Sequence, residues 1–436
     1  MKPRFAIISF PGTNGDTENL RTFKRCGFDP FVFRWNDSHE KLAGVDGYFI
    51  GAGFAYEDRG RAGMVAARDP LFAFLHEEAA KGKVIVGNCN GCQVLVESGL
   101  IPLGEGLRMS LARNVTRHSS KRRSSGDKGQ ATGDFFAPGF LNEWIWITPA
   151  CKGDRCATSD WSGPMHIPMA HGEGRFITKD PDLIKELEAH DQIAFRYCDQ
   201  SGKVSDDPSV TLNGSTDAIA GICNPAGNVV ALMPHPERTV NGDPYFVAMR
   251  KWIEKRLAMS DERLAHTSGT IAMLIAHRLP LTASQVLCNR DPRPLEIFID
   301  TIIVNNEERT VEQAAKRIVP SLKLKQFRYL APQKMTAERI LTSISHFNPN
   351  KEIAYVRREG KWSKWNPDQK IFEQTRTPLR SINLIRRDEP DVGSSGIGGG
   401  ETGICYSCHG MTSDIPQKLQ EIFANPHAST LEQIAS

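Results

Sequence analysis

The sequence predicts an α/β fold: a parallel sheet with helices on both faces, followed by a small two-layer α/β domain. The first observation is that short apolar segments, each of the length of a buried strand, alternate with segments of helical spacing over residues 1–259. The second is that turns rich in glycine, proline and asparagine follow these apolar segments. Parallel strands need long crossover connections, so this alternation is typical of a sheet that is buried on both faces.

The expected elements follow one another along residues 1–259 at regular intervals. The first half contains strands at residues 5–10, 31–35, 45–50 and 84–86, with helices at 17–26 and 64–80. The second half contains strands at residues 140–148, 193–197, 218–223 and 229–233, a polar turn at 168–176 and a closing helix at 243–259. Sites in such sheets gather at the carboxyl ends of the strands, so functional residues are expected in the turns that follow them.

Length and composition limit the classes of protein to which the chain can belong. The chain has 436 residues, enough for two or three domains, with 40% hydrophobic and 24% charged residues, as in soluble globular proteins. A net charge of +3 gives no indication of a nucleic-acid or membrane partner. The apolar run before Pro11 is too short for a signal peptide or a membrane anchor. Ten cysteines without a framework spacing suit reduced thiols, so we expect a cytoplasmic protein.

The stretch VIVGNCNGCQVLVESGL, residues 84–100, contains the first candidate catalytic residue. Cys89 lies between Gly87 and Gly91, in the pattern G-x-C-x-G, where a strand turns sharply into a helix. This is the thiol counterpart of the nucleophile elbow, and glycines allow its tight backbone. The start of the following helix favours a thiolate and offers backbone N–H groups to an oxyanion. Cys89 is therefore a candidate nucleophile, and the alternative is a buried structural cysteine.

The string MPHPER supplies a candidate base for that nucleophile. His235 and Glu237 follow the expected strand at 229–233 and are two residues apart in an extended stretch, which places both side chains on one face. Glu237 would hold the imidazole in one tautomer while His235 takes the thiol proton, as in a catalytic triad. A His-x-Glu string alone is common, but its position directly after a strand supports a catalytic role for these two residues. The turn at residues 51–53 is either a plain tight turn or a backbone oxyanion donor facing Cys89.

Six strings carry a resemblance to a known family. They are, in chain order, FAIISFPGTNGD, GAGFAYEDRGRAG, GNCNGCQVLVESGLIP, PMAHGEGRF, IAFRY and MPHPER. Together they resemble the motifs of the class I, or triad, glutamine amidotransferases, over residues 1–257. Within that family, the FPGTNGD opening, the AHGEGRF loop and the PHPER string are similar to those of the glutaminase subunits of phosphoribosylformylglycinamidine synthase, an enzyme of purine biosynthesis.

The resemblance implies a flavodoxin-like fold and a role for each of a set of residues. Cys89 would be the nucleophile, His235 the general base and acid, and Glu237 its partner. The backbone N–H groups of Gly53 and Asn90 would form the oxyanion hole. The side chains beside the bound glutamine would be Gln93, His171 and Glu173. The resemblance implies no metal site.

The resemblance also implies what the chain does. Cys89 would attack the side-chain amide of glutamine, and ammonia would pass to a synthetase subunit that makes formylglycinamidine ribonucleotide. The chain has no Walker A string, so ATP and Mg²⁺ are expected on the synthetase and no cofactor on this chain. A small bridging subunit is a further possible partner. Two alternatives stay open: an amidotransferase that serves a different synthetase, and a catalytically silent scaffold of the same fold.

Three features depart from the family's pattern. Ala52 stands where glycine is common, Cys92 replaces an aromatic residue beside the elbow, and the basic run after Arg113 is longer than expected. None of them removes a catalytic group. The polar and basic stretch at 108–130 is either a loop that contacts phosphate or a partner, or a solvated insertion.

Beyond residue 259 the sequence resembles no family. We expect a connector at 260–292, the small α/β domain at 293–390, and a flexible glycine-rich linker with a C-terminal tail at 391–436. One hypothesis is that the small domain replaces the bridging subunit; an accessory or oligomerisation domain is the alternative. The string Cys405-x-x-Cys408-His409 has the form of a haem attachment site, and a zinc site, a redox pair and an incidental pair are its other interpretations.

Overall fold

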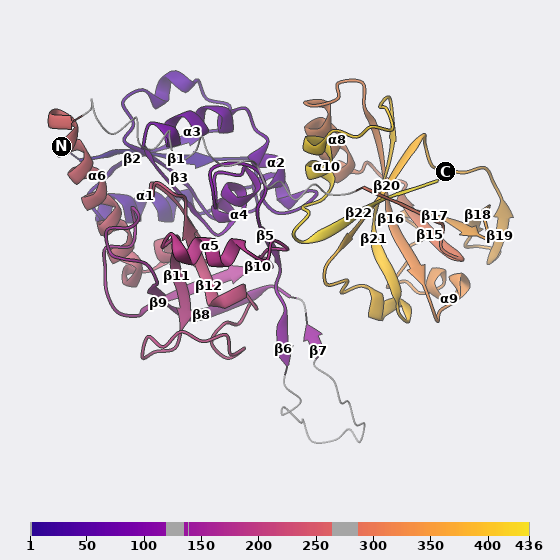
Figure 1. Cartoon of the computed structure of the whole chain (residues 1–436). Helices are drawn as coiled ribbons and strands as arrows, with labels where there is room; N and C mark the ends of the chain where they lie inside the picture. Colours follow the sequence, from indigo (N-terminus) through magenta and orange to yellow (C-terminus); the bar gives the residue numbers. More distant parts are fainter. Residues whose placement is uncertain (1, 119–134, 138, 264–286, 436) are drawn as a thin grey trace. The chain divides into compact units, whose positions relative to one another are not determined.

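The computed structural model describes residues 2–118, 135–137, 139–263 and 287–435 (Figure 1). The chain folds into two compact units, residues 1–283 and residues 284–436. Each unit is built around its own nine-stranded sheet. The expected connector at 260–292 lies mostly outside the described residues. Its two described ends belong to the helix that closes the first unit and to a strand of the second.

The parallel half of the first sheet positions the candidate site. Its strands lie in the order β2-β1-β3-β4-β13, and all four neighbouring pairs are parallel. Their bounds are β1 (Arg4–Ser9), β2 (Asp29–Arg34), β3 (Gly47–Ile50), β4 (Val84–Asn88) and β13 (Val229–Leu232). β4 and β13 are adjacent, so the turns that follow these two strands emerge side by side at the same edge.

The other half of the first sheet is antiparallel, which the alternation of strands and helices did not predict. It continues the order through β12 (Ile219–Cys223), β11 (Ile193–Cys198), β8 (Leu141–Pro149) and β9 (Met165–His171). The physical reason is the length of the connections. β12 and β13 are joined by residues 224–228 alone, too few for a crossover between parallel strands.

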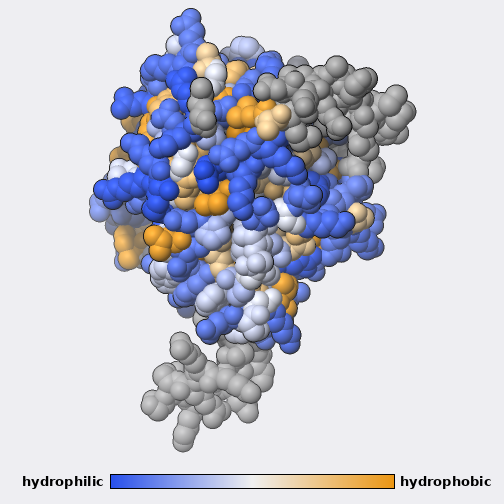
Figure 2. Space-filling model, turned by 90° about the vertical axis from the view of Figure 1, so that its left-hand side faces the viewer, coloured by the Kyte–Doolittle hydropathy of each residue, from blue (hydrophilic) through white to orange (hydrophobic). Residues whose placement is uncertain are grey.

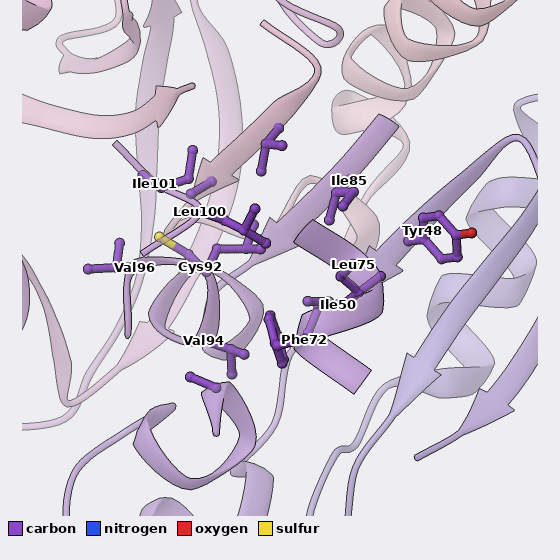
Figure 3. Close-up of a cluster of buried hydrophobic side chains, with 14 of the residues drawn as sticks. Tyr48, Ile50, Phe72, Leu75, Ile85, Cys92, Val94, Val96, Leu100 and Ile101 are labelled. Carbon is purple, nitrogen blue, oxygen red and sulfur yellow. The ribbon is translucent and has the colours of Figure 1, made fainter. Parts of the chain in front are cut away.

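Helices cover both faces of this sheet (Figure 1). They are α1 (Asp16–Arg25), α2 (Met64–Ala67), α3 (Leu71–Ala80), α4 (Asn90–Glu97), α5 (Leu183–Ala189) and α6 (Asp243–Arg263). One hydrophobic cluster joins alternate residues of the central strands to α3 and α4, and Figure 3 shows part of it around Ile50, Leu75 and Ile85. A second cluster joins the opposite residues, such as Phe49, to Phe246 of α6.

Two local expectations in the first unit were wrong. The helix expected at 64–80 is divided into α2 and α3. The break occurs because Pro70 lacks an N–H donor and cannot continue a helix. At the start of α3, Asp69 Oδ1 accepts a hydrogen bond from the N–H of Leu71, 3.0 Å away. The polar turn expected at 168–176 is mostly strand: β9 ends at His171, and β10 (Glu173–Ile177) begins after Gly172.

The basic stretch at 108–130 begins as strands. β5 (Ser110–Arg113) pairs with β10, and β6 (Thr116–His118) pairs with β7 (Phe135–Ala137). Residues 119–134 lie outside the described residues, so both interpretations of this stretch remain predictions.

The second unit is a sheet-rich α/β domain. Its strands lie in the order β14-β22-β20-β21-β16-β15-β17-β18-β19, and every neighbouring pair except β14–β22 is antiparallel. The first strands are β14 (Cys288–Arg290), β15 (Leu295–Thr301), β16 (Lys323–Pro332), β17 (Glu352–Arg358) and β18 (Lys361–Asn366). The others are β19 (Ile371–Gln374), β20 (Ile382–Asp388), β21 (Gly400–His409) and β22 (Ser429–Ile434). Its helices are α8 (Asn306–Lys316), α9 (Ala337–Leu341) and α10 (Gln417–Phe423).

The structure corrects the prediction that residues 391–436 form a flexible linker and tail. β21 lies in the middle of the second sheet, between β20 and β16, and β22 and α10 also belong to the unit. The glycines allow close packing there and do not confer flexibility. A Cβ added at Gly400 would lie 2.1 Å from the carbonyl oxygen of Ala331, and one at Gly403 would lie 2.3 Å from that of Arg386.

The Cys405-x-x-Cys408-His409 string lies within β21, which decides how its thiols are placed. Residues three apart in a strand point to opposite faces of the sheet, so the two thiols do not face one ligand. Both cysteines are buried, and burial raises the pKa of both thiols. This geometry does not fit a haem attachment site, a zinc-binding pair or a redox pair.

The surface and the helices agree with the composition. Hydrophilic side chains predominate on the face shown in Figure 2, and hydrophobic ones occur there as separate patches. Within the described ranges, no helix combines the length and the apolar character needed to cross a membrane.

The packing of Gly91 generates a stability prediction. An added Cβ would lie 1.9 Å from the carbonyl oxygen of Ile50, an atom of the neighbouring β3 backbone that cannot move cheaply. We expect Gly91→Ala to lower the free energy of unfolding by roughly 3 kcal/mol, measured by denaturant unfolding of the full chain. Gly139→Ala is the matched control, because nothing lies within 4 Å of its added Cβ. Equal stability of the two variants would contradict the close approach of α4 to β3.

Candidate active site

Cys89 occupies a strained turn between β4 and α4. Its backbone angles are φ 52° and ψ −107°, a combination that costs free energy for any residue other than glycine. Its N–H donates to the carbonyl oxygen of Leu232 on β13, 2.8 Å away, and its own carbonyl accepts the N–H of Gln93, 3.1 Å away. A Cβ at Gly87 would lie 2.4 Å from the carbonyl oxygen of Gly91. The surrounding backbone therefore forces the turn, as the G-x-C-x-G pattern predicted.

His235 lies beside Cys89 because β13 and β4 are neighbours. Its backbone N–H donates to the carbonyl oxygen of Pro168, 2.9 Å away, and its side chain is fully buried. Nδ1 of the imidazole lies 2.7 Å from Oε1 of Glu237, and the ring lies near enough to Cys89 for the charge of Cys89 to raise its pKa. The structure thus brings the three predicted catalytic side chains together in the order thiol, imidazole and carboxylate.

Glu237 is held from its far side by residues that the sequence did not indicate as functional. Its Oε2 accepts a hydrogen bond from Nδ2 of Asn88, 3.0 Å away, and Oδ1 of Asn88 accepts one from the hydroxyl of Tyr245, 3.3 Å away. Thr22 donates its hydroxyl to the backbone carbonyl of Glu237, 2.8 Å away. Burial opposes the charge of Glu237, but His235 and Asn88 outweigh it, so the pKa of this carboxyl is lowered and it stays ionised.

Charge at the site is concentrated on His235. Burial alone would lower the pKa of its imidazole, but the negative charges of Cys89 and Glu237 outweigh burial and raise that pKa to about 10. At neutral pH His235 is therefore an imidazolium beside the Glu237 carboxylate. Such an imidazolium can donate a proton to a leaving group.

The Gly53 loop lies against the elbow in a way that suits an oxyanion hole. Backbone hydrogen bonds from Asn14 to Ala52, 3.2 Å, and from Phe54 to Gly12, 3.0 Å, flank the Thr13–Gly53 pair. In this pattern the N–H of Gly53 points away from the paired segment. Its φ of 143° requires glycine, and an added Cβ would lie 2.6 Å from the nitrogen of Asn14.

Asn90 connects this loop to the nucleophile. It is the first residue of α4, so its backbone N–H is one of those that a helix leaves without an internal partner. Its side-chain Oδ1 accepts the N–H of Ala55, 2.9 Å away, which fixes the loop that carries Gly53. This hydrogen bond ties the loop that carries Gly53 to the residue that follows Cys89. Ala52, where the family commonly has glycine, is buried in the hydrophobic cluster beneath.

The three predicted substrate-side residues also lie at this site. Nδ2 of Asn90 donates to Oε1 of Gln93, 2.9 Å away, and the Gln93 amide donates to the backbone carbonyl of Glu173. The Cys89 thiol lies 3.6 Å from the carbonyl oxygen of Ala170, which precedes His171. Burial and the positive charge of His235 lower the pKa of His171 to about 3, so this ring stays neutral.

A family model settles the kind of protein. The model of the CobB/CobQ-like glutamine amidotransferase domain matches residues 2–125 and 145–260. The chain belongs to the class I glutamine amidotransferases. It is an enzyme of the PurQ type, and the match lies in the first unit. The resemblance inferred from the six strings is thus confirmed, as is the α/β fold.

Relatives agree with this assignment. Phosphoribosylformylglycinamidine synthase subunit PurQ of Methanothrix thermoacetophila is 40% identical over 272 residues, which cover 58% of this chain and 99% of that protein. The PurQ subunit of Chlorobium luteolum is 36% identical over 53% of this chain and 87% of its own length. Among solved structures, a chain of PurLQS from Thermotoga maritima is 27% identical with a TM-score of 0.44, over 58% of this chain and 100% of that chain.

The raised pKa of His235 generates a prediction about pH. Because folding raises this pKa from 6.5 to about 10, protonated His235 stabilises the fold fully below pH 6.5, and that contribution is lost as the pH rises through about 10. We expect ring resonances of His235 in NMR spectra to titrate near pH 10. Cys89→Ala removes one of the charges that raise this pKa and should therefore lower it.

A second cysteine in the same helix provides the control for that titration. Cys92 is fully buried, and burial raises the pKa of its thiol well above the ordinary value, so it carries no charge near neutral pH. Cys92→Ala should leave the titration of His235 in place. An unchanged His235 pKa in Cys89→Ala would contradict the electrostatic coupling between Cys89 and His235.

Proposed function

We propose that this chain is the glutaminase subunit of phosphoribosylformylglycinamidine synthase. It hydrolyses glutamine to glutamate and ammonia through Cys89, His235 and Glu237. The ammonia passes to an ATP-dependent synthetase subunit, which converts formylglycinamide ribonucleotide to the amidine in purine biosynthesis. The observation that carries the proposal is the imidazole of His235, which lies 2.7 Å from the Glu237 carboxylate and near enough to Cys89 for the charge of Cys89 to raise its pKa.

The first half of the reaction forms a thioester. The Cys89 thiolate attacks the side-chain amide carbon of glutamine, and the N–H groups of Gly53 and Asn90 stabilise the negative oxygen that results. The imidazolium of His235 gives its proton to the departing nitrogen, so the C–N bond breaks and ammonia leaves. Because His171 stays neutral, the proton that is donated belongs to His235.

The second half releases glutamate. His235, now neutral, takes a proton from a water molecule, and the resulting hydroxide attacks the thioester carbon. The C–S bond breaks, and Cys89 leaves as the thiolate. Glu237 keeps the imidazole oriented through both halves and stabilises its charged form, while Asn88 fixes Glu237.

The choice of pathway rests on the relatives. The PurQ subunit that is 40% identical to this chain is matched over 99% of its length, so this chain carries the whole length of a PurQ subunit and a second unit besides. The partner is a synthetase subunit, and ATP and Mg²⁺ bind to it and not to this chain. The second unit, rather than the segment at 293–390 alone, is the part that would take the place of a small bridging subunit.

Glutamate release tests the chemistry and the pathway. With a purine-pathway synthetase, formylglycinamide ribonucleotide and ATP, the wild-type chain should release glutamate, and Cys89→Ala should lower the rate by about 10⁴-fold or more. Cys92→Ala, three residues along the same helix, is the matched control and should stay active.

The outcomes separate the chemistry from the pathway. Cys89-dependent release that does not respond to this synthetase would keep the glutaminase and overturn the pathway. Release that survives in Cys89→Ala would overturn the mechanism. No release by the wild type under either condition would favour a silent scaffold.

A further inference from the structure

The second unit contains an open cavity that the proposed function does not use. Its volume is about 320 Å³, and it is lined by Glu312, Lys323, Leu324, Arg380 and His409. This volume lies at the lower end of the range of small-molecule sites in proteins. Three of the lining residues carry basic side chains and one carries a carboxylate, so the balance of charge in the cavity decides what it binds.

The register of the sheet brings two of the basic side chains together. Lys323 is the first residue of β16 and His409 is the last residue of β21, and the two residues lie directly opposite each other in the antiparallel ladder. Opposite residues project to the same face of a sheet, with their Cβ atoms about 5 Å apart. Both residues are exposed. His409 is thus the member of the Cys405-x-x-Cys408-His409 string that lies at the surface.

Buried polar side chains fix the third basic residue, Arg380, beside the end of β21. Its backbone N–H donates to Oγ of Ser407, 2.6 Å away, and its carbonyl oxygen accepts a hydrogen bond from Nδ2 of Asn383, 3.0 Å away. Ser407 and Asn383 are fully buried, and the Ser407 hydroxyl donates to Oδ1 of Asn383, 2.7 Å away. The hydroxyl of Ser381 donates to the carbonyl oxygen of Cys408, 3.2 Å away. The segment that carries Arg380 is therefore attached to β21 immediately before His409.

The carboxylate in the cavity already has partners of its own. Oε2 of Glu312 accepts the backbone N–H of Leu324, 2.7 Å away, and Oε1 accepts a hydrogen bond from Nζ of Lys316. Burial opposes the charge of Glu312, but Lys316 and this N–H outweigh burial, so the pKa of the carboxyl is lowered and it stays ionised. Lys316 thus matches the charge of Glu312, and the charge of Lys323 is left in excess.

The next lysine on β16 shows that this excess is particular to Lys323. Lys325 lies 2.8 Å from Asp300 and 3.6 Å from Glu308, so its charge is neutralised within the unit. Among the residues that the structure describes, neither Lys323 nor His409 has a carboxylate at ion-pairing distance. Basic groups that converge on one cavity without acidic partners attract an anion.

The donors in the cavity suit a phosphate group. An ammonium, an imidazole and a guanidinium are supplied by β16, by β21 and by the segment before β20, and a phosphate group can accept hydrogen bonds at three oxygens. A guanidinium has five N–H donors, so Arg380 can bind an anion in addition to its contacts within the protein. Leu324 supplies an apolar contact for the carbon part of a phosphate ester.

We propose that this cavity binds a phosphate group through Lys323, Arg380 and His409, carried by a small phosphate ester or present as orthophosphate. The site lies entirely within the second unit and gives that unit a ligand of its own. The inference does not depend on the glutaminase chemistry, so it can fail or hold independently of the proposed function.

Calorimetric titration of the full-length chain at low ionic strength tests the inference with four probes. They are glycerol 3-phosphate, orthophosphate, glycerol, and malonate, a dianion without a phosphate group. The two phosphate probes should bind, and glycerol should not. Lys323→Gln should weaken phosphate binding about 10-fold, and the double variant Lys323→Gln, His409→Gln about 100-fold, because charge-assisted hydrogen bonds are lost. Both residues are exposed, so unfolding midpoints should match that of the parent chain.

Lys361→Gln is the matched control. Lys361 is also the exposed first residue of a strand, β18, and lies opposite a basic residue, Arg358, but it does not line the cavity. This variant should bind all four probes like the parent chain.

The outcomes either support the inference or overturn it. Tighter binding of glycerol 3-phosphate than of orthophosphate supports it and identifies a phosphate ester as the ligand, whereas equal binding supports it with free phosphate as the ligand. Four results would overturn it: no binding of either phosphate probe, unchanged affinity in the double variant, an equal loss in Lys361→Gln, or malonate binding as tight as phosphate binding.

Discussion

The strained turn at Cys89 is the constraint on which the rest of the site depends. Cys89 has a side chain, yet its backbone adopts a conformation that favours glycine. It keeps this conformation because the backbone segments packed around the turn allow no other. Gly87 approaches the backbone of Gly91, and Gly91 approaches the β3 backbone, more closely than a side chain would allow. The result is a thiol that projects from the sheet at the start of a helix, where backbone N–H groups and the helix dipole favour negative charge.

The topology of the sheet brings the other groups to that thiol. β4 and β13 are parallel neighbours, so His235 lies beside Cys89 although 145 residues separate them in the sequence. The Gly53 loop follows β3, on the other side of β4, and Asn90 fixes it with a hydrogen bond to Ala55. One asparagine next to the nucleophile thus connects the oxyanion loop, Gln93 and Asp58. The site is one polar network on neighbouring strand ends.

Sequence patterns predicted those parts of the site that depend on local geometry. The glycines around Cys89 indicated a sharp turn, and the spacing of His235 and Glu237 indicated a shared face. Asn88 and Tyr245 were missed because they act through contacts between distant segments: Tyr245 lies in α6, and only the fold brings its hydroxyl to Asn88. No periodicity in α6 distinguishes that tyrosine from the core residues around it.

The errors in the fold have a similar cause. Strand–helix alternation does not show that β12 and β13 run antiparallel, because the direction depends on the length of a short connection. The glycines around Gly400 have the composition of a linker, yet they lie in a central strand because its neighbours approach closely. The composition of a segment indicates how flexible it is in isolation, whereas its conformation in the folded unit depends on the strands that pack against it.

The central claim is that glutamine is hydrolysed through a covalent bond to Cys89. The most direct measurement is mass spectrometry of the full chain, quenched with acid during turnover of glutamine in the presence of the synthetase and then digested. We predict a glutamyl adduct on the peptide that carries Cys89 and on no other cysteine peptide. Glutamate release during turnover with no adduct on that peptide, or with an adduct on another cysteine, would contradict the account.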